Sequence, residues 1–305
     1  MQALSSGVEV LRVARKISAG VGFPFAVASL DGEEVAASNG LCLAPNLPVA
    51  QVNRDDIVLV VSGAGADETE NSDMVAQIRR WARHGVRVWA LSSGVIRLAQ
   101  AQLLTGRKVA AHWEDAAYLA ARFPGVKISS ALFIHDDRHA TCAGGNAAAE
   151  FLMDYLARRG SGELVDEIAA RLMLDGIRDG RLNQNRPFRF RYQTTNKTVF
   201  AALKLMEEHV FDKLSINEIA ARLQVTQRHL ERLFQANFGS SPAKVYAELR
   251  LNAARQEVLH RRRPILDIAQ DYGYSRGTFS KAYKRAFGVA PSHDQKSPIS
   301  VRHGI

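Results

Sequence analysis

The 305 residues contain only two cysteines, Cys42 and Cys142. This number excludes a disulfide framework and suits a reducing compartment. The chain also lacks a long apolar run. Its start, MQALSSGVEVLRVARK, has no apolar segment of the kind found in secretory signal peptides. The longest strand-like apolar run, residues 57–61, is far too short to span a bilayer. We therefore expect a soluble, cytoplasmic protein with no membrane partner.

Positive charge is concentrated in the second half of the chain. Residues 1–177 carry 17 basic and 20 acidic side chains, whereas residues 197–291 carry 16 and 9. A solvated basic face or attraction to phosphate groups explains this surplus. The polar, arginine-rich segment between them is expected to be a linker, or alternatively to lie along DNA phosphates. The predicted organisation is a domain over 1–177, a basic linker over 178–196, a cationic domain over 197–293 and a tail over 294–305.

Residues 1–177 alternate between strand-like and helix-like segments. Strands are expected at residues 25–30, 57–61, 86–91, 108–112, 128–134 and 139–142, and helices at residues 8–18, 73–84, 95–104, 114–123, 147–159 and 164–174. This alternation predicts an α/β domain with a mostly parallel sheet and helices on both faces.

One pattern occurs twice near the end of the chain, 49 residues apart. Residues 214–242 read LSINEIAARLQVTQRHLERLFQANFGSSP, and residues 263–291 read RPILDIAQDYGYSRGTFSKAYKRAFGVAP. Both copies keep an Ile-Ala pair and a Phe-Gly-x-x-Pro ending in register. A repeat that keeps its register through helix, turn and helix indicates two copies of one structural unit. We interpret each copy as a helix-turn-helix in an all-α domain that binds double-stranded DNA.

In the first copy, residues 217–223 are expected to form the supporting helix. Thr226 would cap the recognition helix over residues 227–238, whose leucine and phenylalanine side chains face the core. The outer face then carries Gln227, Arg228, Glu231, Arg232 and Gln235. Arginine reads guanine and glutamine reads adenine in the major groove, so these residues are candidate base contacts. Glu231 could instead orient Arg228 or Arg232, and a solvated face or phosphate contact is the alternative for any of the five.

The second copy follows a long helix expected over residues 242–260. Its supporting helix is predicted at residues 265–271, and Ser275 would cap a recognition helix over residues 276–287. The outward side chains of that helix are Arg276, Thr278, Ser280 and Lys281. Two helices held about one turn of DNA apart can enter successive major grooves, so one monomer would read a long half-site.

Residues 197–291 resemble the DNA-binding domain of the AraC/XylS family of transcriptional regulators. Both helix-turn-helix units, both Phe-Gly-x-x-Pro endings and the LRLNAARQEVL segment between them carry the resemblance. It implies a homodimer and RNA polymerase as a partner. Family members usually have one more residue between the turn and the core phenylalanine than Gly273-Tyr274 to Phe279 allows. We therefore expect a re-phased second recognition helix, whose base contacts Gly277 weakens further because the first copy has Arg228 there.

A strand, a tight turn and a helix are predicted at VWALSSGVIRLA, residues 88–99. Such a turn raises one side chain at a helix N-terminus, where backbone N–H groups favour anions. The segments SSGVIRLAQAQLLTGRKVAAHWE and HATCAGGNAAAEFLMDYL resemble the class I glutamine-amidotransferase-like superfamily, in the PfpI-type branch fused to AraC-type domains. This resemblance implies a flavodoxin-like fold. Active members carry cysteine at the turn and a histidine downstream, and here Ser92 and His112 hold those positions.

A serine hydroxyl is a weak nucleophile unless a base accepts its proton. Ser92 and His112 could form such a pair, but they would need an acidic group to orient the histidine. The superfamily often places that acid near a strand preceding the first helix. This chain begins almost at the helix, so either the start codon is misassigned or the sheet lacks a strand. We expect no catalytic residues and no enzyme activity. The alternative is a Ser/His hydrolase or amidase fused to a DNA-binding domain.

Binding is the expected use of this degenerate elbow, because regulators of the branch resemble sensors of amino acids or quaternary amines. Backbone donors at Ser92, Ser93 and Gly94 would hold a carboxylate. Trp113 would face an ammonium group or pack in the core, and Glu114 would pair with that charge or favour the helix N-terminus. His112 and Gly63 complete the candidate set, although a Gly-x-Gly after a strand also suits a simple turn.

The run His135-Asp136-Asp137-Arg138-His139 contains residue types that bind metals. Its spacing is more typical of a polar turn, so we expect no metal site and no cofactor. The combined prediction is a sequence-specific transcriptional regulator, an activator, that responds to a small nitrogenous metabolite.

Overall fold

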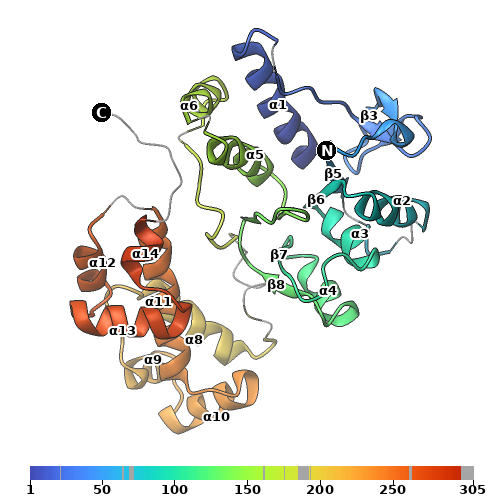
Figure 1. Ribbon diagram of the computed structural model, residues 1–305. Coiled ribbons are helices and arrows are strands. Elements are labelled where there is room, and N and C mark those ends of the chain that lie inside the picture. Colours follow the sequence, from blue (N-terminus) through green and yellow to red (C-terminus); the bar gives the residue numbers. More distant parts are fainter. Residues whose placement is uncertain are drawn as a thin grey trace. The chain divides into compact units, whose positions relative to one another are not determined.

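The computed structural model describes residues 1–20, 22–63, 65–68, 72–160, 162–174, 176–184, 192, 194–260 and 263–296. Within these ranges the chain forms two compact units, which divide after Gln184. Figure 1 colours the front unit from blue to yellow-green and the second unit from yellow to red. Each unit has its own hydrophobic core.

The main sheet of the front unit contains β5 (Ile57–Ser62), β6 (Arg87–Ser92), β10 (Thr141–Cys142) and β9 (Phe133–Ile134), in that order. β5, β6 and β10 run parallel, and β9 is antiparallel to β10. The prediction of a mostly parallel sheet is therefore confirmed. Within the described residues β5 is an edge strand that pairs with β6 alone.

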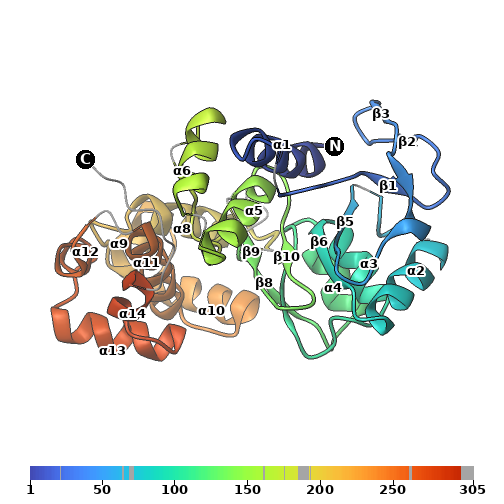
Figure 2. The ribbon, with the colours of Figure 1, turned by 45° about the horizontal axis from the view of Figure 1, so that its top comes forward.

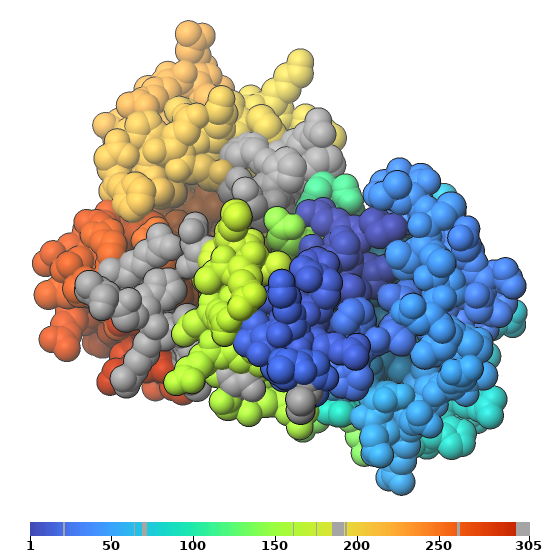
Figure 3. Space-filling view, turned by 90° about the horizontal axis from the view of Figure 1, so that it is seen from above, coloured from blue at the N-terminus to red at the C-terminus, as the bar shows by residue number. Residues whose placement is uncertain are grey.

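Helices cover both faces of this sheet. They are α1 (Gln2–Ile17), α2 (Ser72–Arg83), α3 (Gly94–Gln100), α4 (Ala116–Arg122), α5 (Ala147–Arg158) and α6 (Gly162–Arg171). α2 and α3 lie on one side of β5 and β6, whereas α1 and α5 lie on the other (Figures 1 and 2). Figure 3 shows α1 (dark blue) beside α6 (yellow-green). The helix expected over residues 8–18 begins earlier, at Gln2.

Side chains of β6 alternate between the two faces, as the two-residue period of a strand requires. Val88 and Ala90 belong to the core that α2 and α3 share with β5. On the opposite face, the Trp89 ring packs edge-on against Phe151 of α5, with ring centroids 5.4 Å apart. β6 is thus the buried centre of the unit, which fixes where its last residue emerges.

Short elements flank the main sheet. β1 (Ala28–Ser29) pairs with β4 (Leu47–Pro48), β2 (Val35–Ala36) with β3 (Cys42–Leu43), and β7 (Lys108–Ala110) with β8 (Lys127–Ser129), while the 3-10 helix η1 (Val49–Gln51) follows β4. The strand expected over residues 25–30 is therefore only two residues long. The backbone of β1 pairs with β4 outside the main sheet.

The helix expected over residues 95–104 ends at Gln100. Gln102 has a left-handed backbone with φ of 63°, and the N–H of Leu103 donates to the carbonyl of Leu98 at 3.1 Å. This is a Schellman ending, in which a residue with positive φ, usually glycine, stops the helix. Leu104 is fully buried after the turn, which explains why the apolar pattern continues beyond the helix.

Residues 178–184 pack in the front unit and are not part of a linker. Arg178 donates two hydrogen bonds to the Glu150 carboxylate, at 2.6 and 2.7 Å. Leu182 is 4% exposed, and the side chain of Gln184 bonds to the backbone of the unit. The predicted linker therefore starts too early in the sequence. Residues 185–191 and 193 lie outside the described residues.

The second unit is helical in its described part. Its helices are α8 (Lys197–Glu208), α9 (Ile216–Arg222), α10 (Gln227–Phe238), α11 (Pro242–His260), α12 (Ile265–Asp271), α13 (Arg276–Phe287) and α14 (Pro291–Lys296). The predicted bounds of α10 to α13 are confirmed, because caps and apolar spacing define them locally. None of the helices in the described ranges has the length and apolarity needed to cross a membrane.

The two helix-turn-helix units have matching backbones. Ile219 and Ile268 occupy equivalent positions in α9 and α12, and both are fully buried. Gln224 and Gly273 occupy equivalent turn positions, and both have positive φ, at 56° and 68°. The prediction of two copies of one structural unit is confirmed.

Helix α14 crosses the boundary predicted at residue 293. Asp294 is 2% exposed and accepts hydrogen bonds from the Tyr283 hydroxyl (2.8 Å) and from Nε of Arg255 (3.2 Å). Burial and the neighbouring Asp294 carboxylate raise the pKa of Tyr283. The Arg255 guanidinium also lies 4.4 Å from the centroid of the Phe287 ring. These contacts make α14 part of the helical unit.

Candidate functional site

Strand β6 ends at Ser92, where the chain turns sharply into α3. Ser92 has φ of 55°, a left-handed conformation that is uncommon for a residue with a side chain. Ser93, the residue before α3, is 6% exposed. The carboxyl end of a parallel strand is where open α/β sheets bind ligands. The predicted strand, turn and helix are therefore present, with Ser92 at the turn.

Two glycines let the main chain close around Ser92. A Cβ atom added to Gly94 would lie 2.1 Å from the carbonyl oxygen of Val60, so α3 starts directly against β5. A Cβ atom added to Gly144 would lie 2.7 Å from Cβ of Ser92. Gly144 also has φ of 95°. A side chain is therefore excluded at Gly94 by the main chain of Val60 and at Gly144 by the Cα and Cβ atoms of Ser92.

Gly63 lies at the same edge of the sheet as the elbow. It follows Ser62, which is level with Ser92 in the pairing of β5 and β6. A Cβ atom added to Gly63 would be 3.5 Å from Oγ of Ser38, so the loop after β2 reaches this edge.

Ser92 and His112 do not form a nucleophile and base pair. Within the described residues no hydrogen bond joins them. Instead Nδ1 of His112 lies 3.4 Å from the carboxylate of Glu114, whose side chain is 65% exposed. The His112 ring also lies beside Trp113, with centroids 5.4 Å apart. His112 is therefore engaged with Glu114 and Trp113 in the described structure.

Asp115 is a functional candidate that the sequence analysis did not select. Its Oδ2 atom is buried and has no hydrogen-bond partner in the part of the chain that the structure describes. Burial raises the pKa of this carboxyl, and the Ser93 hydroxyl and His112 oppose that rise, whereas Asp67 and Glu114 add to it. An acid just before a helix usually caps it, but the Asp115 side chain makes no cap hydrogen bond to α4.

Gln184 holds the loop that carries these residues. Its Oε1 accepts a hydrogen bond from the peptide N–H of Trp113 at 2.9 Å. Its Nε2 donates to the carbonyl oxygens of Ala111 (2.8 Å) and Ala131 (3.0 Å). The Gln184 side chain therefore anchors the loop at Trp113 to residues 178–184, the last described segment of the front unit before the second unit begins. No local sequence pattern marks it.

The two recognition helices begin in the same phase. Leu230 lies four residues after the cap Thr226, and Phe279 lies four residues after the cap Ser275. Both core side chains are fully buried. The two copies therefore agree with each other, because the cap fixes the helix start and the core residue follows one turn later. The expected re-phasing is relative to other family members and stays a prediction.

The five predicted contact residues of α10 are all exposed. Nε2 of Gln227 donates to the Glu231 carboxylate at 2.8 Å, so Glu231 pairs with Gln227 and does not orient Arg228 or Arg232. Nη2 of Arg232 lies 3.2 Å from Nδ1 of His229. Arg228 makes no hydrogen bond or ion pair within the described ranges, which leaves its guanidinium available.

The outer face of α13 is less regular. Arg276 and Lys281 are exposed, whereas Ser280 is half-buried. The Thr278 hydroxyl donates to the Ser275 carbonyl at 2.9 Å and lies 2.8 Å from the Ser275 hydroxyl. Thr278 is therefore engaged in the helix cap, and Arg276 and Lys281 are the better placed of the four for contacts outside the chain.

Two parts of the chain match known families. Residues 4–158 match the DJ-1/PfpI family, and residues 219–297 match a helix-turn-helix domain. The HTH-type transcriptional regulator CdhR of Pseudomonas aeruginosa is 31% identical over 305 residues, which cover 98% of this chain and 90% of that protein. The chain belongs to the HTH-type transcriptional regulators that carry a DJ-1/PfpI domain.

Other similarities cover the same regions. The HTH-type transcriptional regulator GbdR of Pseudomonas aeruginosa is 32% identical over 294 residues, covering 96% of this chain and 80% of that protein. The crystal structure of an AraC family transcriptional regulator from Pseudomonas putida is 24% identical, with a TM-score of 0.49, and the match covers 56% of this chain and 92% of that one. The predicted function, DNA-binding regulation of transcription by an AraC-type domain, is confirmed by the family.

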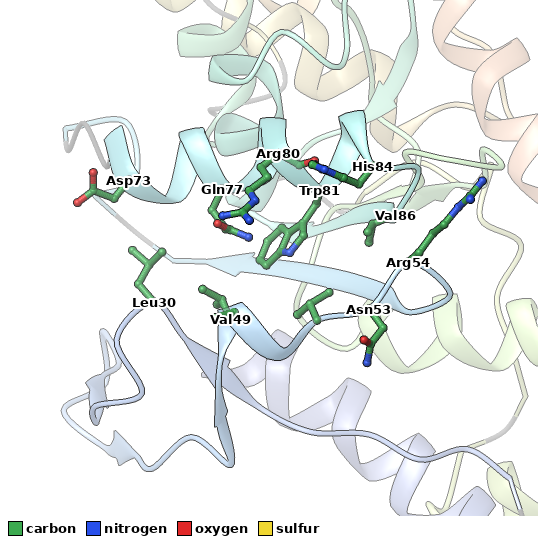
Figure 4. A pocket seen from close by; sticks show the side chains of 12 residues that line it. Leu30, Val49, Asn53, Arg54, Asp73, Gln77, Arg80, Trp81, His84 and Val86 are labelled. Carbon is green, nitrogen blue, oxygen red and sulfur yellow. The ribbon is translucent and has the colours of Figure 1, made fainter.

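The regulator also has a cavity of about 560 Å³ between α2 and the segment after β4 (Figure 4). Its lining includes Leu30, Val49, Ala50, Val52, Asn53, Arg54, Asp73, Gln77, Arg80, Trp81, His84 and Val86. Figure 4 shows Asp73 at one end and Arg54 at the other. None of the predicted ligand-binding residues lines this cavity, so it provides a comparison site for experiments on the elbow.

The polar run that begins at His135 is held by protein contacts. Asp136 accepts a hydrogen bond from Arg107 at 2.6 Å and two from backbone N–H groups of the same turn at 3.0 Å. Nε2 of His135 lies 2.7 Å from Oδ2 of Asp154. The described ranges contain no group of three His, Cys, Asp or Glu residues able to hold a metal ion.

Replacing Gly94 with alanine should destabilise the front unit of the regulator. The new Cβ would lie 2.1 Å from the Val60 carbonyl oxygen, and main chain must move to relieve that clash. We expect the free energy of unfolding, measured in urea, to fall by about 3 kcal/mol. Gly162→Ala is the control, since nothing lies within 4 Å of its added Cβ, and it should change stability by less than about 1 kcal/mol. Equal losses would contradict the close approach.

Proposed function

We propose that this regulator activates transcription in response to a small amine-bearing metabolite, an amino acid or a quaternary amine, that binds at the elbow. The observation that carries the proposal is the Asp115 carboxyl. One of its oxygens is buried and has no partner in the described residues, and it lies among other acidic groups at the end of the parallel strands.

The charge of the elbow favours a cationic group. Two further carboxyl groups, those of Asp67 and Glu114, and one histidine, His112, lie near enough to Asp115 to affect its charge. Ionising a buried carboxyl near like charges costs free energy, which raises the pKa of Asp115. A bound ammonium would offset that cost, whereas a wholly anionic ligand would add repulsion.

The opposite end of a zwitterion would meet the start of α3. We assign a ligand carboxylate to the backbone N–H groups of Ser92, Ser93 and Gly94, where the helix dipole also favours an anion. The face of Trp113 would contact a quaternary ammonium through a cation–π interaction. Gly63 and His112 would complete the wall of the site.

We propose binding without catalysis at this elbow. Ser92 replaces the cysteine that active members of the superfamily carry, and no base is bound to its hydroxyl in the described residues. A Ser/His hydrolase or amidase fused to a DNA-binding domain is the alternative function. Turnover of an amide or ester that is lost in Ser92→Ala would establish that alternative.

On the DNA side, we propose contacts from the outward residues of α10 and α13. These are Gln227, Arg228, Glu231, Arg232, Gln235, Arg276, Thr278, Ser280 and Lys281. Arg228 is the strongest candidate for base contact, because it is exposed and unengaged in the described residues. We also propose a homodimer that contacts RNA polymerase. Light scattering of the purified protein tests the dimer, and transcription in vitro with purified polymerase tests the second contact.

A thermal-shift screen of the full-length protein tests the ligand and its site. Amino acids, betaines or carnitine-like amines should raise Tm, whereas carboxylates of similar size without nitrogen should not. A ligand at about 100 times its Kd stabilises the protein by about 2.7 kcal/mol. Asp115→Asn should abolish the shift, because it removes the buried negative charge.

Gln77→Leu is the matched control for this screen, because Gln77 lines the cavity beside α2. It should leave the shift unchanged. Ligand affinity should also fall as the pH is lowered through the raised pKa of Asp115, since protonation removes its charge. A shift that survives in Asp115→Asn and is lost in Gln77→Leu would assign the ligand to the cavity of Figure 4.

Gln184→Leu should separate ligand binding from the DNA response. Gln184 ties the loop at Trp113 to the segment that continues toward the second unit. We expect Kd for the ligand to change by less than about threefold. The factor by which the ligand changes DNA affinity should fall by about tenfold, which is within the usual range of coupling between two sites. Fluorescence anisotropy with and without ligand measures both. Asn183→Ala, in the same segment, is the control, and an unchanged response in Gln184→Leu would contradict this route.

Arg228→Ala should weaken DNA binding and relax the preference for one base. A lost arginine contact to guanine costs about 1–3 kcal/mol, measured by anisotropy on a duplex selected from random DNA by the wild-type protein. Gly277→Arg adds the equivalent side chain to α13, where nothing lies within 4 Å of its Cβ. It should raise affinity and increase the salt dependence. Loss of affinity without a change in base preference would indicate phosphate contact by Arg228.

A further inference from the structure

Helix α11 joins the two helix-turn-helix units and contributes to both cores. Tyr246, near its start, belongs to the first core, and Leu251, one turn later, belongs to the second. Arg250 lies between them and is only 6% exposed. A cation is rarely buried in this way unless its hydrogen bonds are satisfied, so its partners indicate what it does.

The Arg250 guanidinium connects two segments that are far apart in the sequence. Its Nε donates to the carbonyl oxygen of Val210, in the loop after α8, at 2.8 Å. Its Nη2 donates to the carbonyl oxygen of Tyr272, the residue that ends α12, at 2.6 Å. The guanidinium also lies 6.0 Å from the centroid of the Tyr274 ring. One side chain therefore joins the loop after α8 to the turn of the second helix-turn-helix.

The turn of the second unit is shaped around this arginine. A Cβ atom added to Gly273 would lie 3.2 Å from Nη2 of Arg250, and Gly273 already has a φ of 68°. Val210 follows α8, whose buried residues belong to the first core, yet it packs against the second core. The two helix-turn-helix units are consequently packed against each other at this loop, and α11 is not their only connection within the described residues.

The repeat supplies an internal control for this arginine. The residue 49 positions before Arg250 is Ala201, in α8. The first unit nevertheless makes the same left-handed turn, at Gln224, and buries the same apolar positions. Arg250 is thus not needed to build a helix-turn-helix. Its hydrogen bonds instead join the second helix-turn-helix to the loop after α8.

We propose that Arg250 is a positioning residue that fixes the separation of the two recognition helices and thereby sets the spacing between the two DNA elements that one monomer reads within a half-site. The guanidinium is a rigid, planar fork, so two bonds to separate carbonyls limit rotation between the two helix-turn-helix units. Inserting one base pair moves one element by about 3.4 Å relative to the other and rotates it by roughly 35°. A fixed junction cannot follow that change, whereas a loosened one can. The proposal concerns DNA binding alone and does not depend on the effector site.

The test uses the full-length protein and a duplex selected from random DNA by the wild-type chain. Related duplexes carry one or two base pairs added or removed between the two recognised elements, or have one element scrambled. For the wild type, a change of one base pair should reduce affinity by about tenfold, as expected when a groove contact is misaligned. The variants are Arg250→Met, which keeps apolar bulk without the fork, and Arg250→Lys, which keeps the charge.

Arg250→Met should bind the selected duplex about tenfold more weakly, yet bind the half-scrambled duplex like the wild type, within about twofold. Its affinities for the different spacings should converge, and Arg250→Lys should be intermediate. Tyr283→Phe, which loses a hydrogen bond inside the second core, is the control and should keep the wild-type spacing profile.

A folded Arg250→Met that keeps the wild-type profile would overturn the proposal, as would equal losses on whole and half-scrambled duplexes. If Arg250→Met does not fold, as judged by circular dichroism, Arg250→Lys decides the matter. A wild-type profile in that variant would then overturn it.

Discussion

The front unit depends on the close approach of α3 to β5 at Gly94. Because no side chain separates the helix from the Val60 carbonyl, β6 can end at Ser92 and turn into α3 within one residue. Ser92 itself has a left-handed backbone, and Gly144 fits closely against it. The sharp turn holds Ser92 at the carboxyl edge of the parallel strands.

The elbow carries a serine at its turn, and within the described residues no base is hydrogen-bonded to the Ser92 hydroxyl. The titratable groups near Asp115 are mainly carboxyls. Ionisation of the Asp115 carboxyl is unfavourable, because the group is half-buried and one of its oxygens has no hydrogen-bond partner in the described residues. The contribution of Asp115 to stability therefore declines as pH rises from its ordinary pKa toward the raised one. Under the proposed function, a bound cation would recover that loss and so stabilise the front unit.

The second unit solves a different problem, which is to hold two similar modules in one geometry. Each helix-turn-helix has its own core, its own cap and its own left-handed turn. The second copy is distinguished by polar contacts with its surroundings. Arg250 joins the turn after α12 to the loop after α8, and Asp294 of α14 bonds to Tyr283 and Arg255. All of them are buried or partly buried polar contacts, which require defined directions and therefore specify an arrangement more narrowly than apolar packing does.

The sequence by itself determined the features that rest on short-range periodicity. The two recognition helices, α10 and α13, have their predicted bounds because Thr226 caps the first, Ser275 caps the second, and apolar residues recur in each every three or four positions. The same reasoning placed the turn at Ser92, and a family resemblance supplied its significance. The tertiary structure alone decided the early end of α3 at Gln100, the packing of residues 178–184, the buried Oδ2 atom of Asp115 and the anchors Gln184 and Arg250. Gln184 and Arg250 bond to residues as far as 73 positions away, and no local pattern encodes a partner that only folding brings near.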